Sequence, residues 1–285
     1  MIRAFSGDGG GVFGTIPSCQ LQDYDVYKDF DVLGGCSISS ALVAGYAVGM
    51  TGSEILKEMQ DGLPQIFKKP WYRCLYPLGS KWPNAELKKW CKKNFDIKMG
   101  DIEKPIFIVA MNFSHRRPKI FSNTDKKDRD IPLYEAVLAS VSAPTYFPPM
   151  DIYVDGGLFA NNPSVVTCAG ASDALGIDIN NINLFSIGTG NLHKKPIDMK
   201  KAKRWSSLRW ARHIVPVMLE GGNEIGMDFI AKKLPLNTYV RSNIIDLDEN
   251  WDMDDASIIP ELIARTLEKQ SIFKKTMDDF LKGSK

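Results

Sequence analysis

The sequence predicts an α/β protein, a three-layer α/β/α fold with a mostly parallel central sheet. Two observations predict this fold. Short apolar runs alternate along the chain with longer segments of helical periodicity, which is typical of parallel strands joined by helices. The apolar runs are nearly continuous, as expected for strands that are buried on both faces. A chain of 285 residues is also long enough to bury a sizeable core.

Four apolar runs are the expected strands, and they cover residues 2–6, 30–33, 106–112 and 182–187. Helical segments lie between and after them, at residues 15–23, 39–50, 53–67, 132–142, 163–175 and 257–281. In the last segment, apolar residues recur at helical spacing, so we expect one face of it to lie on the core. That face contains Ile259, Leu262, Ile263, Thr266, Phe273, Met277 and Phe280.

The chain contains no internal repeat and no low-complexity linker. This favours a single domain over residues 1–285. Within it, we expect residues 191–285 to form a carboxyl-terminal extension of helices and strands that packs on a core made by residues 1–190.

Composition excludes several classes of protein. The formal net charge of +2 is too small for the basic footprint that nucleic-acid binding requires. The five cysteines are odd in number and contain no C-x-x-C pair, so neither a disulfide scaffold nor a zinc site is indicated. Thiols in a reducing cytoplasm are the simpler interpretation.

The amino terminus reads as a strand rather than a charged and then apolar leader, so no signal peptide is expected. The longest nearly apolar run, residues 41–50, is shorter than the roughly 20 residues that span a bilayer. We therefore predict a cytoplasmic protein without a membrane-spanning segment.

Ser37 lies between an expected strand and an expected helix, in the segment "GCSIS". In a strand-turn-helix nucleophile elbow, the residues two before and two after the serine must be small, as Gly35 and Ser39 are. The positive end of the following helix favours a developing oxyanion. By itself, the pattern leaves Ser37 as either a packing residue or a nucleophile.

A glycine-rich segment, "GDGGGVFG", follows the first strand and opens a helix. Adjacent glycines allow several backbone N–H groups to point at one anion. That anion is either the oxyanion of an acyl-transfer intermediate or the pyrophosphate of a dinucleotide, because G-x-G-x-x-G from Gly9 also fits the dinucleotide fingerprint. Asp29 and Asp31 lie at about the distance of a ribose-binding acid, but they precede or begin the second strand instead of ending it. A nucleotide-binding oxidoreductase therefore remains an alternative.

The segment "YVDGGLFANNPSVV" brings Asp155 from a short strand to the turn Gly156-Gly157. A helix is expected to begin after Asn161-Asn162-Pro163. Aspartate before glycine is common in turns, so Asp155 is either a turn residue or a functional partner of another motif.

Four motifs follow one another along the chain: "DGGGVFG" at 8–14, "GCSIS" at 35–39, "ASVSAPTYFPP" at 139–149 and "DGG" at 155–157. In this order and in these contexts they resemble the patatin-like phospholipases, and also the catalytic core of cytosolic phospholipase A2. The resemblance extends to about "SIGTG" at 186–190, and beyond residue 194 nothing identifies a particular member.

The resemblance implies a lipid acyl hydrolase with a serine–aspartate dyad and no metal or organic cofactor. Ser37 would attack the ester carbonyl and Asp155 would take its proton. Gly9, Gly10 and Gly11 would hold the oxyanion. The substrate would be a phospholipid or a related lipid at a membrane surface, reached by peripheral contact, with no stable protein partner.

Two positions depart from the family pattern. Phe13 stands where the family usually has arginine, and Ser39 stands where the elbow usually has glycine. These departures keep a second hypothesis open, in which the chain is a non-catalytic lipid- or protein-binding module on a decayed hydrolase fold.

The three histidines, His115, His193 and His213, lie outside the motifs in polar or basic surroundings. Their positions favour the dyad over a triad containing histidine. Cys36 precedes the serine and is expected to be a small buried filler rather than a thiol nucleophile.

Two stretches, residues 66–93 and 200–213, interleave aromatic and basic side chains. Each is either an interfacial membrane surface or a set of inward-packed aromatics with solvated lysines. The acidic run 246–257 lacks the glycine and the terminal glutamate of a calcium loop, and Asp255 or Ser257 is expected to cap the last helix instead.

Overall fold

The computed structural model describes residues 1–68, 79–192, 196–218 and 223–283. Their centre is a seven-stranded sheet with the order β4-β3-β2-β1-β6-β8, in which β5 pairs with β3. β4 and β5 are antiparallel to β3, and the other pairs are parallel. The strands are β1 (Ile2–Gly7), β2 (Val32–Cys36), β3 (Ile106–Asn112), β4 (Arg117–Ser122), β5 (Tyr153–Asp155), β6 (Ile182–Ile187) and β8 (Thr238–Ser242).

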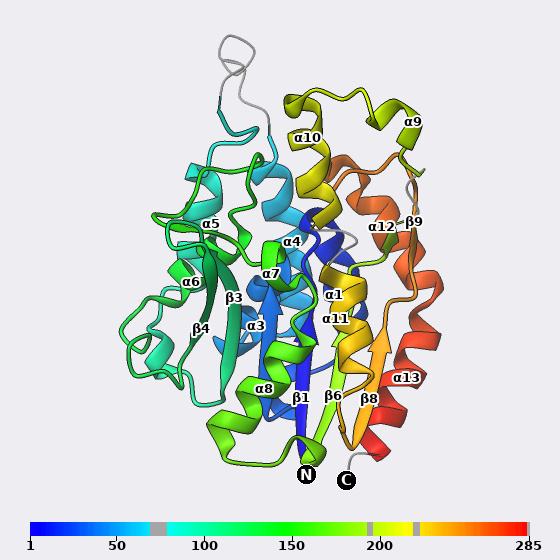
Figure 1. Cartoon of the computed structure of the whole chain (residues 1–285). Helices are drawn as coiled ribbons and strands as arrows, with labels where there is room; N and C mark the ends of the chain where they lie inside the picture. The colour runs from blue at the N-terminus through cyan, green and yellow to red at the C-terminus, as the bar shows by residue number, and fades with distance from the viewer. Residues whose placement is uncertain (69–78, 193–195, 219–222, 284–285) are drawn as a thin grey trace.

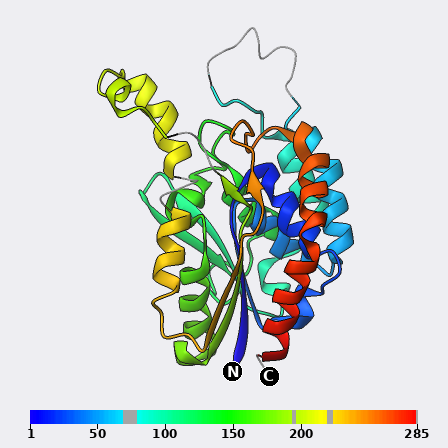
Figure 2. The same cartoon turned by 90° about the vertical axis from the view of Figure 1, so that its right-hand side faces the viewer.

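Helices cover both faces of this sheet, which confirms the predicted three layers (Figures 1 and 2). On one face lie α3 (Ile38–Ala47), α6 (Leu133–Val141) and α13 (Gln270–Gly283), together with α1 (Thr15–Gln20), α4 (Gly52–Ile66), α5 (Ala85–Asn94) and α12 (Ile259–Glu268). On the other face lies α8 (Ser164–Leu175), with α7 (Gly157–Ala160) and α11 (Asn223–Ala231) beside it.

The central strand β1 shows why both faces are buried. Phe5 packs edge to face on Phe30, with ring centroids 5.4 Å apart, in the large cluster beneath α3 and α13. Its neighbour Ala4 points to the opposite face and packs with Cys168 of α8. Successive side chains of a strand point to opposite sides, so helices on both faces of the sheet bury both sets of side chains.

The segment 191–285 adds to the same sheet and core. β8 pairs in parallel with β6, and Phe280 of α13 stacks on Phe30 at a centroid distance of 5.8 Å. The predicted helix over 257–281 is not continuous, because α12 ends at Glu268 and α13 begins at Gln270. None of the helices in the described ranges combines the length and apolar character needed to cross a bilayer.

The second strand is displaced from its predicted position. Phe30 ends the short helix α2 (Val26–Asp29), and β2 runs from Val32 to Cys36. Its two glycines are held in the sheet by pairing with β1 on one side and β3 on the other. Pairing with two neighbours overrides the weak strand propensity of glycine.

Candidate active site

The motifs meet at the carboxyl edge of the sheet, where open α/β sheets bind their ligands. β1 and β2 end side by side, with Gly7 opposite Gly35, and lead into the glycine-rich loop and into Ser37. Asp155 ends β5 and lies opposite Ala110 of β3. Three segments that are distant in sequence therefore converge at one point.

Ser37 forms the turn between β2 and α3 in a backbone conformation that is rare for a residue with a side chain, with φ 49° and ψ −126°. Hydrogen bonds on both sides hold it there. The Ser37 N–H donates to Ser140 Oγ at 2.9 Å, and Ser40 Oγ donates to the Ser37 carbonyl at 2.6 Å. Such strain persists only when the surrounding structure fixes it, and it is the geometry of a nucleophile elbow.

The two small residues beside the serine are in close contact with each other. A Cβ atom at Gly35 would lie 2.5 Å from the Ser39 carbonyl oxygen, so only glycine fits there. Ser39 itself is buried, and its hydroxyl has no hydrogen-bond partner among the described residues. The serine at the position where the family usually has glycine is thus enclosed in the core with its hydroxyl unpaired.

The Ser37 hydroxyl contacts the Asp155 carboxylate. Ser37 Oγ donates to Asp155 Oδ2 at 2.6 Å, and the Gly157 N–H donates to Asp155 Oδ1 at 2.7 Å. Gly156 lies against the Val109 carbonyl, so the turn predicted at Gly156-Gly157 aims the carboxylate at the serine. Burial raises the pKa of Asp155 to about 6, although the hydrogen bonds from Ser37 and Gly157 oppose that rise.

The three glycines of the loop, which were predicted to share one role, differ in what their N–H groups contact. The Gly9 N–H donates to the Asn161 carbonyl at 3.0 Å in this structure, and its predicted role as an oxyanion donor stays a prediction. Gly9 also allows the loop to approach the serine, because a Cβ there would lie 2.9 Å from Ser37 Cβ. The N–H groups of Gly10 and Gly11 have no acceptor among the described residues. Their role as oxyanion donors stays a prediction.

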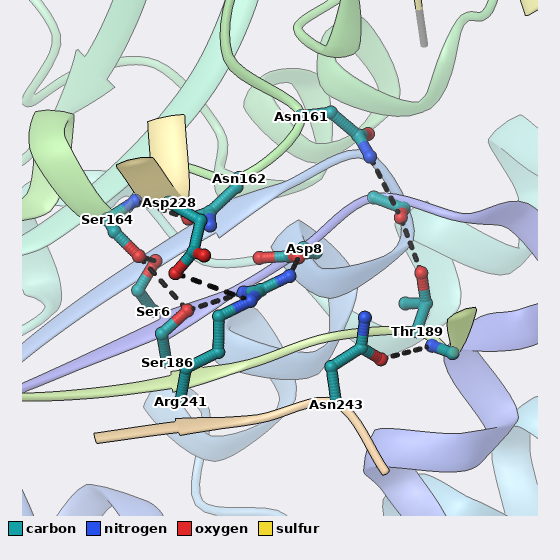
Figure 3. Close-up of polar contacts among 12 residues, drawn as sticks. Ser6, Asp8, Asn161, Asn162, Ser164, Ser186, Thr189, Asp228, Arg241 and Asn243 are labelled. Carbon is teal, nitrogen blue, oxygen red and sulfur yellow. Dashed lines mark hydrogen bonds and ion pairs between the residues drawn. The ribbon is translucent and has the colours of Figure 1, made fainter. Parts of the chain in front are cut away.

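Side chains that the sequence did not single out hold this loop in place (Figure 3). Thr189 Oγ1 donates to the Gly9 carbonyl at 2.7 Å, and Asn161 Nδ2 reaches the same oxygen at 3.4 Å. The Met253 carbonyl accepts the Val12 N–H at 2.8 Å. Thr189 lies in "SIGTG" and Asn161 in "ANNP", both recognisable segments whose function was not evident before the fold was known.

Beneath the loop is a buried ion pair (Figure 3). Arg241 Nη2 lies 2.6 Å from Asp8 Oδ2, and Asp8 is fully buried. Arg241 Nη1 donates to Ser186 Oγ at 2.8 Å, and its Nε lies 3.8 Å from the carboxylate of Asp228. Burial raises the pKa of Asp8, whereas the Arg241 guanidinium lowers it. Arg241 thus fixes the first residue of the glycine-rich motif.

We expect Arg241→Gln to lower the free energy of unfolding by about 3–5 kcal/mol, because it leaves the Asp8 carboxyl buried without its cation. Urea denaturation monitored by circular dichroism measures the change. The control is Lys275→Gln, which removes an exposed pair with Asp279 and should leave the midpoint unchanged. Equal stability of the two variants would show that Arg241 does not support the loop.

A cavity of about 460 Å³ opens beside Ser37 and Asp155. Its walls are mostly apolar, and they include Leu63, Ile66, Phe67, Leu87, Trp90, Val141 and Phe147. Phe13 also lines it, packed among Ile16 and Trp251, so the position where arginine is usual is here part of an apolar wall. Such a cavity suits an acyl chain better than a charged ligand.

Other candidates lie away from the serine. His115 is exposed beside Asn112, and the His213 ring packs at a tilt against Trp205, whereas His193 lies outside the described residues. Asp31 Oδ2 accepts the Arg3 N–H, which places it at the opposite end of β1 from the glycine-rich loop. The arrangement required for a dinucleotide ribose is therefore absent from the described residues.

In the first of the two aromatic and basic stretches, the described tryptophans point inward. Within 66–93, residues 69–78 lie outside the described residues, and both Trp82 and Trp90 are buried. For these two tryptophans, the membrane interpretation is wrong. The acidic run is structural, and Asp254 accepts the Trp82 indole N–H at 2.6 Å. Asp255 caps the short 3-10 helix Ala256–Ile258, whereas α12, which follows it, has no side-chain cap, so the predicted cap lies one turn before the helix. Among the described residues, no cluster of side chains could hold a metal ion.

A family model described as "Patatin-like phospholipase" matches residues 7–165, more than half of the chain. The chain belongs to this family. The cGAMP-activated phospholipase of Escherichia coli (strain TW11681) is 25% identical to this chain over an alignment 295 positions long. That alignment includes 90% of this chain and 83% of that protein. Patatin group M-1 of Solanum tuberosum is 25% identical over an alignment 322 positions long. That alignment includes 90% of this chain and 80% of that protein.

The crystal structure of VipD from Legionella pneumophila has the same fold, with a TM-score of 0.52 at 13% identity. The alignment covers 99% of this chain and 67% of that one. Membership of the patatin-like phospholipases indicates a lipid hydrolase. The matched range contains the glycine-rich loop, Ser37 and Asp155, whereas Arg241 lies outside it.

Proposed function

We propose that the protein is a phospholipase A-type lipid acyl hydrolase that cleaves carboxylic esters through a dyad of Ser37 and Asp155. The observation that carries this proposal is the 2.6 Å hydrogen bond from Ser37 Oγ to the buried Asp155 carboxylate, at a strained turn and beside an apolar cavity. The substrate class is phospholipids or related lipids. Action in the cytoplasm at a membrane surface is part of the proposal.

In the proposed reaction, Ser37 Oγ attacks the ester carbonyl while its proton passes to Asp155. The N–H groups of Gly10 and Gly11 stabilise the oxyanion of the tetrahedral intermediate. The ester bond then breaks, and the departing alcohol takes the proton from Asp155. Water attacks the acyl-enzyme, returns a proton through Asp155 to Ser37, and releases the fatty acid.

An aspartate with an ordinary pKa of about 4 is a weak base near neutral pH. The burial that raises the pKa of Asp155 to about 6 brings it closer to the operating pH, where a general base is most effective. The hydrogen bond from Gly157 fixes the carboxylate so that its other oxygen faces the serine. These features support a catalytic role over that of a turn residue.

The alternative of a decayed, non-catalytic module rests on Phe13 and Ser39. Phe13 is accommodated in a packed apolar wall, and Ser39 fits beneath the elbow. Neither side chain separates Ser37 from Asp155. The intact contact between these two residues favours the catalytic proposal.

A fluorophosphonate probe tests the proposal directly. We expect the purified protein to form a covalent adduct that peptide mass mapping places on Ser37, and to release fatty acid and lysophospholipid from phosphatidylcholine. Absence of both, under conditions that label a known serine hydrolase, would favour the non-catalytic module.

The rate of labelling should rise with pH through about 6 and then level off. Below that pH, Asp155 holds a proton and cannot accept one from Ser37, whereas above it the carboxylate is free to do so. The check is the second-order labelling rate constant measured on both sides of this pKa. A flat profile would contradict the assignment of Asp155 as the base.

A further inference from the structure

The helices beside the mouth of the cavity carry an unusual number of exposed apolar side chains. α10 (Ser207–Val217) presents Trp210, Ile214 and Val217, which recur at i, i+4 and i+7 on one face. On α11, Ile225 and Phe229 are 70% and 63% exposed. We call these five residues the α10–α11 face. Figure 2 shows α10 standing clear of the sheet, above α11 and at the end where the active-site strands finish.

This face is continuous with the proposed active site. Val217 and Ile225, one from each helix, also line the cavity that contains Ser37. A hydrophobic body seated on the face would therefore lie at the entrance through which an acyl chain must pass. Large apolar side chains that gather at one exposed surface mark an interaction site rather than ordinary scatter.

The charges beside the face indicate what it binds. Residues 198–217 contain six lysines and arginines and one aspartate. Five of these basic side chains are exposed on or beside α9 (Met199–Ala202) and α10, namely Lys200, Lys201, Lys203, Arg204 and Arg209. Apolar side chains flanked by cations match a bilayer with anionic headgroups. A second copy of the chain is a poorer occupant, because a symmetric contact would bring the same cations together.

We propose that the α10–α11 face docks on an anionic phospholipid membrane and so places the cavity mouth at the lipid surface. The proposal rests on the proposed function for its biological meaning. Its binding step is independent of catalysis and can be measured in a Ser37→Ala background, where no lipid is consumed.

The experiment is co-sedimentation with vesicles of phosphatidylcholine containing phosphatidylserine. We expect Ile214→Asp/Phe229→Asp to weaken vesicle binding at least about tenfold, because two carboxylates would have to enter the interface. The matched control is Leu267→Asp/Ile272→Asp, which places the same charges at two apolar positions that are likewise exposed. The control should bind as the parent does, and vesicles without phosphatidylserine should retain less protein.

With Ser37 restored, Ile214→Asp/Phe229→Asp should keep its activity on a soluble short-chain ester while losing activity on vesicles. Equal vesicle binding by the two double variants would overturn the proposal. So would a concentration-dependent dimer that only Ile214→Asp/Phe229→Asp abolishes, because the face would then bind a second copy. If the parent binds vesicles but cleaves no ester, the membrane surface stands and the proposed hydrolase function fails.

Discussion

Ser37→Ala is expected to lower kcat/KM for ester hydrolysis by at least about 10⁴-fold. In the proposed reaction this hydroxyl forms the acyl-enzyme, and no other hydroxyl among the described residues is hydrogen-bonded to Asp155. The measurement is release of fatty acid from phosphatidylcholine, together with turnover of a soluble ester. The fluorophosphonate adduct should disappear in the same variant.

The matched control is Ser271→Ala, which removes an exposed hydroxyl on α13. It should retain full activity. Ser37→Ala should also keep its unfolding midpoint within a few degrees, because the bonds that fix residue 37 involve its backbone N–H and carbonyl rather than its side chain. Substantial activity in Ser37→Ala would reject the dyad, and collapse of the fold would leave a packing role for the serine.

The contact between Ser37 and Asp155 could be expected from the sequence because the motif that carries each residue is local. A glycine-rich turn after a strand, a serine between a strand and a helix, and an aspartate before two glycines are short patterns with definite backbone meanings. The fold then brings them together at one edge of the sheet. Asp155 gains its significance only there, because the antiparallel pairing of β5 with β3 places it beside Ser37.

The supports of the site could not be predicted, because they are remote in sequence. Arg241 pairs with Asp8 across 233 positions, and β8, which carries it, has no long apolar run. Nothing in the sequence around Gly9 indicates that its N–H donates to the Asn161 carbonyl. The burial of Trp82 and Trp90 was likewise hidden, since interleaved lysines occur both on membrane surfaces and on ordinary solvated helices.

Asp155→Asn is expected to lower kcat by about 10⁴-fold with a smaller effect on KM. Asparagine has nearly the same shape and still accepts the Gly157 N–H, but its amide cannot take a proton from Ser37. The apolar walls that would hold the acyl chain are unchanged. Steady-state kinetics with the soluble ester and with vesicle lipid measure both constants, and Asp151→Asn, an exposed replacement four residues earlier, is the control.

The same substitution should make the protein more stable at neutral pH. The pKa of Asp155 is about 6 in the folded protein and close to 4 when unfolded, so the folded state binds the extra proton between these values. Stability therefore falls as pH rises through that window, and the ionised carboxylate costs on the order of 2–3 kcal/mol above it. Asparagine removes this cost, and its advantage should disappear below pH 4.

Urea unfolding at neutral and at acidic pH separates the two roles left open for Asp155. If Asp155 is a base whose burial destabilises the fold, Asp155→Asn should lose activity and gain stability. If Asp155 is only a turn residue, activity and stability should fall together, because a neutral amide accepts the Gly157 N–H more weakly than the carboxylate does. That second outcome would remove Asp155 from the chemistry and leave Ser37 without an identified base.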